Sequence, residues 1–110
     1  MGCAFFASQS NAFLQRHIRK ISQSTGSVFI TQHARLRMRQ RAIGIAEVFE
    51  TLRFGVIERP PIVNAKKGNL ECRLQRYVGG RECAVVIALS DDEPDLIVVT
   101  VMNIAIRESD

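Results

Sequence analysis

Aromatic side chains that could stack on nucleic-acid bases are scarce in this chain of 110 residues. Tryptophan is absent, and Tyr77 is the single tyrosine. Because proteins that read single-stranded RNA stack its bases on aromatic rings, this shortage argues against sequence-selective recognition of a single strand.

Segments that would place the chain in a membrane are also missing. No run approaches the roughly 18–20 apolar residues that a membrane-spanning helix needs. The first residues, MGCAFFA, carry no basic side chain, and their apolar run is too short for a secretory signal. We therefore expect a cytoplasmic protein that has no membrane partner.

Cysteine is sparse, with Cys3, Cys72 and Cys83 as its three occurrences. An odd number, without any CxxC or Cys/His spacing, argues against a zinc site and favours reduced thiols. Nucleotide-binding glycine loops and the catalytic signatures GxSxG and HExxH are absent too. The sequence thus predicts no cofactor and no bound metal.

The charge of the chain is distributed unevenly. Its length fits one domain, and its net charge is +4. Residues 1–60 contain nine Lys and Arg against three Glu, a net +6, whereas residues 61–110 contain six against eight acids, a net −2. The basic half suits a polyanion, a membrane surface or an acidic protein, and charge alone does not choose among them.

The densest basic segment is QHARLRMRQR, residues 32–41. If it is helical, residues four apart share a face, so His33, Arg37 and Arg41 form one polar stripe, and Thr31 is placed as the N-cap. Four arginines within seven positions repel one another, and an anionic partner would relieve that repulsion. A solvated basic face is the alternative interpretation, because charged helix faces usually meet water.

A family resemblance is carried by the pattern HA-x-x-R-M-x-x-R-x-I over residues 33–43, by a second helix EVFETLRFG and by strands ending in IVVTVM. Over about residues 28–103 the chain resembles a bacterial family of unknown function, usually grouped with the barnase/EndoU/colicin/RelE (BECR) superfamily of ribonuclease toxins. Two positions depart from the pattern, since Ala42 stands where the family commonly has Gly, and Gly44 where it commonly has Ser. The resemblance implies a fold more directly than an activity.

The expected fold class is α+β, with two or three helices packed on one face of a four-stranded antiparallel sheet, as the resemblance to RelE implies. Apolar spacing predicts helices at residues 10–22, 32–41 and 45–54. Strands are expected at residues 56–63, 70–78, 82–89 and 96–102, with a further short one at 28–30. His17 lies in the apolar stripe of the first helix, where we expect a packed histidine rather than a catalytic one.

The expected domain organisation has three parts. They are an N-terminal helix and linker at residues 1–27, the α+β domain at 28–105 and a tail at 106–110. Residues 1–9 are expected to be loosely held. Glu47 and Glu50 are expected to solvate the helix at 45–54, and Gly55 to terminate it as its C′ residue.

The pair Gly79-Gly80, between two β-rich runs, predicts a two-residue hairpin and thereby a strand register. In this register, the sequence numbers of two paired residues add up to 159. Leu74 therefore lies opposite Val85, and both face the core. The same register puts Arg73 and Tyr77 on the other face. The expected core combines Met38, Val48, Phe49, Leu52, Leu74, Val85, Ile87 and Val99.

The chain offers residues for metal-independent RNA cleavage, which needs a base for the ribose 2′-hydroxyl, a cation for the phosphate and an acid for the leaving oxygen. His33 can exchange a proton near neutral pH, Arg37 can grip a phosphate with two hydrogen bonds, and Tyr77 can act as a donor if the fold brings it near. The candidate catalytic residues are therefore His33, Arg37 and Tyr77. Candidate nucleic-acid contacts are Arg35, Arg37, Arg39, Arg41 and Arg73.

Two functions remain open. The leading hypothesis is a small cytosolic toxin-like protein that binds RNA as a metal-independent endoribonuclease, held in check by an acidic antitoxin or immunity protein. The alternative is a non-catalytic phage or mobile-element protein whose basic helix binds and inhibits a host protein or nucleoprotein. The enzyme would need His33 in a cleft beside a second proton donor, whereas the binder would not.

Overall fold

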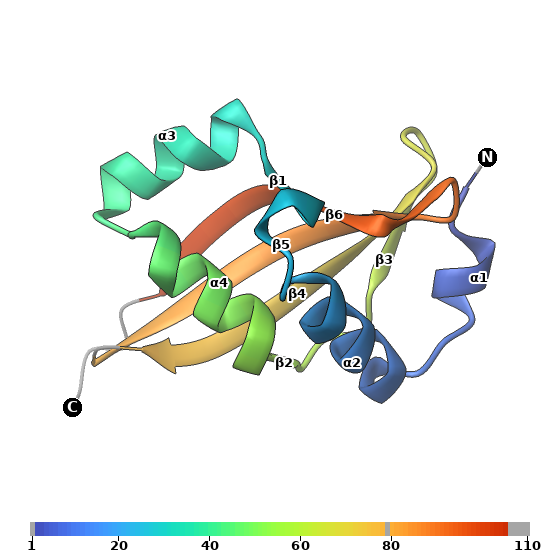
Figure 1. Ribbon diagram of the computed structural model, residues 1–110, viewed down its shortest axis with the longest axis horizontal. Helices are drawn as coiled ribbons and strands as arrows, with labels where there is room; N and C mark the ends of the chain where they lie inside the picture. Colours follow the sequence, from blue (N-terminus) through green and yellow to red (C-terminus); the bar gives the residue numbers. More distant parts are fainter. Residues whose placement is uncertain (1, 79, 106–110) are drawn as a thin grey trace.

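The computed structural model describes residues 2–78 and 80–105 of the chain (Figure 1). The helices are α1 (Ala4–Ala7), α2 (Asn11–Ile21), η1 (Thr25–Ser27, a 3-10 turn), α3 (Gln32–Arg41) and α4 (Ile45–Phe54). The strands are β1 (Val28–Ile30), β2 (Val56–Ile57), β3 (Ile62–Asn64), β4 (Asn69–Val78), β5 (Arg81–Ser90) and β6 (Glu93–Ala105). The three helices expected from apolar spacing are confirmed, and α1 is an addition.

The strands form one six-stranded sheet in the order β1-β6-β5-β4-β2, with β3 also paired to β4. Six strands replace the four expected, for two reasons. Pro60 and Pro61 lack the amide proton that a ladder needs, so the first expected strand is divided into β2 and β3. The short β1 also joins the sheet, parallel to β6, with Val28 opposite Ile97. The fold is α+β with a mostly antiparallel sheet.

The register predicted for the hairpin of β4 and β5 is confirmed. Leu74 lies opposite Val85, and Cys72 lies opposite Ile87. Gly80 has a φ of 83°, the left-handed conformation that a tight hairpin turn demands and that glycine adopts without strain. Gly79 lies outside the described residues.

The core lies between the sheet and the helices that cover one of its faces. In Figure 1, α4 crosses in front of β4 and β5, and α2 packs beside α4. Of the predicted core residues, Met38 and Phe49 pack half-buried at the edge. The other six are completely buried, namely Val48, Leu52, Leu74, Val85, Ile87 and Val99. None of the described helices packs on the opposite face of the sheet.

The N-terminal segment belongs to the same core, contrary to the expectation that residues 1–9 are loosely held. Cys3 and Phe6 are only 5% and 1% exposed. The backbone N–H of Asp91, after β5, donates to the Gly2 carbonyl at 2.9 Å. A helix of four residues is too short to show an apolar period, which is why the sequence did not reveal α1.

Two backbone positions shape the C-terminal ends of α3 and α4, namely the C-caps Ala42 and Gly55. Ala42, in the turn before α4, has a φ of 54°, a left-handed conformation that costs an L-residue about 1–2 kcal/mol. Gly55 ends α4 in an extended conformation with a φ of −71°, so it is not the left-handed C′ glycine expected. It must be glycine for another reason, because a Cβ there would collide with the carbonyl oxygen of Thr51.

Candidate nucleic-acid interface

Helix α3 is fixed to the sheet at its N-cap residue, Thr31. The Thr31 side chain accepts a hydrogen bond from Ala34 N–H at 3.1 Å, which confirms Thr31 as the N-cap. The Thr31 hydroxyl also donates to the Thr100 carbonyl at 3.3 Å, and Thr31 N–H donates to the Val99 carbonyl at 3.1 Å. The helix therefore starts where β1 ends and continues along β6 (Figure 1).

The arginines of α3 differ in their surroundings. Arg35, Arg39 and Arg41 are exposed, and Arg37 is half-buried. Arg41 is engaged in an interaction within the chain, whereas the side chains of Arg35, Arg37 and Arg39 make no hydrogen bond or ion pair with any described residue. The guanidinium groups of these three arginines are therefore free to bind an anion.

His33 is exposed near the start of α3, beside these arginines. Its imidazole lines a shallow surface hollow together with Gln32, Leu36 and Arg39. An incoming phosphate could therefore meet an imidazole and a guanidinium from adjacent turns of one helix. Arg37, expected on the same stripe as His33, does not line this hollow.

The local electrostatics are strongly positive. The chain contains no Asp or Glu before Glu47, so α2 and α3 carry seven Lys and Arg and no carboxylate. The N-terminus of α3, which carries a partial positive charge from the helix dipole, also lacks an acidic residue in its first turn. Little within this helix neutralises its charge.

The residues expected from the sheet lie elsewhere. Tyr77 and Arg73 are on β4, which is separated from β6 by β5, and they are on the face that no described helix covers. Tyr77 is 66% exposed, and the Nε of Arg73 is buried without a hydrogen-bond partner in the described part of the chain. The structure therefore does not bring Tyr77 or Arg73 together with His33.

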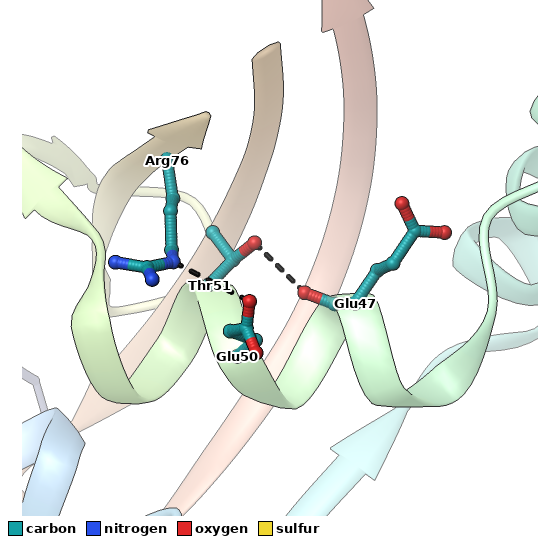
Figure 2. Close-up of polar contacts among 4 residues, drawn as sticks. All are labelled: Glu47, Glu50, Thr51 and Arg76. Carbon is teal, nitrogen blue, oxygen red and sulfur yellow. Dashed lines mark hydrogen bonds and ion pairs between the residues drawn. The ribbon is translucent and has the colours of Figure 1, made fainter. Parts of the chain in front are cut away.

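A cluster on the helix-covered side was not anticipated from the sequence. Arg76 reaches from β4 to α4, with its Nε 3.6 Å from Oε2 of Glu50, as Figure 2 shows. The Arg76 guanidinium also lies over the ring of Phe54, 5.0 Å from its centroid. Glu50 thus pairs with a cation at the core edge, although it was expected only to solvate α4. The hairpin register, which put Arg76 on the core face, was the signal that could have revealed this cluster.

The other carboxylate of α4, Glu47, has a structural role. It accepts a hydrogen bond from Gly44 N–H at 3.1 Å, which caps the start of α4. Its backbone carbonyl accepts from the Thr51 hydroxyl at 2.8 Å (Figure 2). Gly44 has no side chain with which to complete a reciprocal capping box.

His17 is a packed histidine, as expected. Its Nε2 is 2.8 Å from the Pro94 carbonyl oxygen, and its ring is parallel to that of Phe13, with centroids 6.2 Å apart. The half-buried ring also contacts Phe6. A neutral imidazole with its proton on Nε2 would donate to that carbonyl, which fixes the ring in place.

Residues 2–78 and 80–105 contain no group of three or more His, Cys, Asp or Glu that could hold a metal ion. None of their helices is both long and apolar enough to cross a membrane.

Comparison with known proteins identifies the family of this chain. No curated protein and no solved structure matches the chain significantly. The family model described as "Domain of unknown function (DUF4258)" matches residues 30–103, a span that runs from the end of β1 into β6 and includes α3 and α4. The chain belongs to the DUF4258 family.

Proposed function

We propose that the protein is a small toxin-like RNA-binding protein of the BECR type, that α3 binds the RNA backbone, and that His33 makes it a metal-independent endoribonuclease. The observation that supports this most is the set of three unpaired arginines beside an exposed imidazole on one helix. Guanidinium groups bind phosphate with two parallel hydrogen bonds, and they retain their charge at every physiological pH.

The proposed reaction uses the ribose 2′-hydroxyl as the nucleophile. His33 takes the proton of this hydroxyl while its oxygen attacks the adjacent phosphorus. The bond from phosphorus to the 5′-oxygen breaks, and that oxygen leaves with a proton from water. The products are a 2′,3′-cyclic phosphate and a 5′-hydroxyl. Arg39, which shares the surface hollow with His33, would stabilise the charge that develops on the phosphate.

Tyr77 is left out of this proposed centre because β4 lies two strand positions away from β6 and Tyr77 faces the uncovered side of the sheet. Strands are spaced by about 4.8 Å, so two positions place its backbone roughly 10 Å from that of β6. A phenol at that distance, on the other face, could not donate to a leaving oxygen at His33 in the same arrangement.

The same geometry favours a second candidate function. His33 is exposed, and no Asp, Glu, Tyr or second His lines its hollow in the described part of the chain. A general acid–base pair is therefore incomplete, whereas a binding surface needs no proton donor. The second candidate is a non-catalytic protein of phage or mobile-element type that uses α3 to bind and inhibit an acidic host protein or a nucleoprotein.

Two substitutions separate the candidates. If the protein is an enzyme, His33→Ala should lose a factor of about 10²–10⁴ in the cleavage rate of total RNA, because a general base acts only in the transition state. RNA affinity should hardly change, since a neutral imidazole releases few counterions. Arg39→Ala should lower both the rate and the affinity, because its charge attracts phosphate before and during reaction.

The experiment would measure the cyclic phosphate product and RNA binding for the same preparations, with His17→Ala as the matched histidine control. Cleavage that survives His33→Ala would remove the histidine from the mechanism. If the wild-type protein binds RNA but produces no cyclic phosphate, the inhibitor candidate replaces the enzyme. If it neither binds RNA nor cleaves it, the nucleic-acid proposal fails as a whole.

A further inference from the structure

The uncovered face of the sheet is more apolar than a sheet surface that meets water. Antiparallel strands with one wet face alternate apolar and polar residues, whereas strands buried on both faces are apolar throughout. The core of β5, CAVVIAL at residues 83–89, is continuously apolar, and so is LIVV at residues 96–99 of β6. Their side chains that point away from the helices include Val86 and Val98. The two central strands therefore have the composition of strands that are covered on both sides.

We call this surface the open face. Its positions used below are Phe29, Ile62, Glu71, Arg73, Tyr77, Glu82, Val86, Ala88, Leu96 and Val98. Large, exposed apolar side chains project from the strands at its two edges. Phe29 on β1 is 58% exposed, and Ile62 on β3 is 66% exposed. The strand register joins them in one row across the sheet, since Phe29 pairs with Val98, Val98 with Ala88, Ala88 with Glu71 and Glu71 with Ile62.

Two hollows lie on the open face beside these raised side chains. Ala88, Leu96 and Val98 contribute to one of them, and Ile62, Arg73 and Val86 contribute to the other. A surface that has both projections and hollows can fit a rotated copy of itself. Such self-complementarity is what a two-fold symmetric interface requires, because the same patch is used on both sides.

The charges of the open face favour a second copy of the chain over RNA as the molecule that covers it. Glu71 and Arg73 lie two residues apart on β4, and Glu82 lies opposite Tyr77 on β5, so both signs are present. RNA would be repelled by the carboxylates, and it finds a surface without carboxylates on α3. A second copy supplies both signs in return, so the Arg73 guanidinium of each copy can face a carboxylate of the other.

The size of the open face is sufficient for a stable dimer. The sheet path is five strands wide, and β4 and β5 each have ten residues. The strands β1 to β6 contain 41 residues in all. With strands about 4.8 Å apart and a rise of about 3.4 Å per residue, the face covers roughly 670 Å². Stable interfaces bury roughly 600–1,000 Å² on each partner, so this area lies within their range.

We propose that a second copy of this chain packs on the open face, so that the protein is a two-fold symmetric dimer with its two sheets face to face. Helix α3 lies outside this interface, along β6, so each dimer carries two copies of the basic helix on its outer surface. The proposal does not depend on the proposed function, because it involves neither His33 nor the arginines of α3.

The test is the molar mass of the full chain in solution, measured by light scattering after RNase treatment and in high salt. We expect twice the 12.3 kDa of one chain. Ile62→Glu places a charge on the open face, and it should weaken dimerisation at least tenfold. Ile45→Glu is the matched control, because Ile45 is also exposed, at 48%, but lies at the start of α4. The control should remain a dimer.

Phe29→Glu places a charge at the other edge of the open face, and it tests whether the effect of Ile62→Glu is merely local. Circular dichroism would establish that each variant is folded. Dissociation of both folded variants, with the control intact, supports the proposal. A wild-type chain that has the mass of one copy at every concentration overturns it. A double mass that disappears with RNase treatment also overturns it, because RNA would then be the occupant that joins the copies.

Discussion

The carboxylate of Asp91 accepts a hydrogen bond from the backbone N–H of Phe5 at 2.9 Å, although the two residues are 86 positions apart in the sequence. Its other oxygen lies 3.4 Å from Phe6 N. Asp91 therefore caps α1 from the turn between β5 and β6, in place of a local N-cap, since Cys3 makes no side-chain capping bond.

Replacing Asp91 by alanine should therefore release α1. Removing an N-cap typically costs about 1 kcal/mol of stability, and loss of the α1 contacts would add to it. Urea unfolding would measure the change, and limited proteolysis should cut the variant first near residue 5. Asp92→Ala is the control, because Asp92 is exposed in the same turn and its side chain has no such role. Equal stability of both variants would contradict this account of α1.

Glycine at position 42 should stabilise the protein. Ala42 is held at a φ of 54°, where an L-residue is strained by about 1–2 kcal/mol and glycine is not. Ala42→Gly also gives the unfolded chain more freedom, which offsets about 0.4–1 kcal/mol, so a net gain of up to about 1.5 kcal/mol is expected. The same change at Ala46, inside α4, should instead cost about 1 kcal/mol. Thermal unfolding of the two variants should therefore shift in opposite directions.

RNA binding should depend on salt through the arginines of α3. Each phosphate that a cation neutralises contributes about 0.7 to the slope of log affinity against log salt for a single strand. Arg35→Gln and Arg39→Gln should each lower the slope by roughly that amount, as measured by fluorescence anisotropy with a labelled oligonucleotide. Lys66→Gln, in the turn between β3 and β4, is the charge-matched control and should leave the slope unchanged. A slope that responds equally to all three changes would indicate non-specific attraction to the net charge.

The buried thiols should make the protein less stable in alkali. Burial raises the pKa of Cys72 to about 12, and burial together with the Asp91 carboxylate raises the pKa of Cys3. An unfolded thiol loses its proton above about pH 8.5, so unfolding releases a proton there and stability falls as the pH rises. Below that pH both states hold the proton, and this contribution is constant.

Cys72→Ala should reduce the loss of stability between about pH 8.5 and 10, where one thiol can contribute as much as 1.4 kcal/mol per pH unit. The comparison is the urea midpoint of the variant and the wild type at each pH. A thiol reagent should also react with the wild-type chain only as fast as it unfolds. Rapid reaction of Cys3 or Cys72 in the native protein would show that the burial is incomplete.

The central features of the fold could be predicted because they depend on local patterns. Gly79-Gly80 fixed the register of β4 and β5, and Thr31 marked the start of α3. The position of β1 could not be predicted, since three apolar residues do not specify a partner strand. The capping of α1 by Asp91 is equally hidden, because it joins opposite ends of the chain.

The candidate site was predictable only in part. The arginines and His33 occupy a single helix, and their spacing was readable from the sequence. The position of Tyr77 relative to His33 depends on which strands lie between them and on which face α3 meets. That arrangement is tertiary and leaves no local signal.

The pairing of β1 with β6 has a consequence for the order of folding. Helix α3 is held by Thr31 to Val99 and Thr100, and Thr100 is synthesised 69 residues after Thr31. A ten-residue helix rich in like charges is scarcely stable alone, since isolated helices shorter than about 12–15 residues are marginal in water. At about 5–20 residues per second, synthesis from Thr31 to Thr100 takes several seconds. During that interval the nascent chain contains the basic sequence, but the contacts that order α3 are missing. Any activity that requires the ordered helix therefore begins only after Val99 and Thr100 have been synthesised.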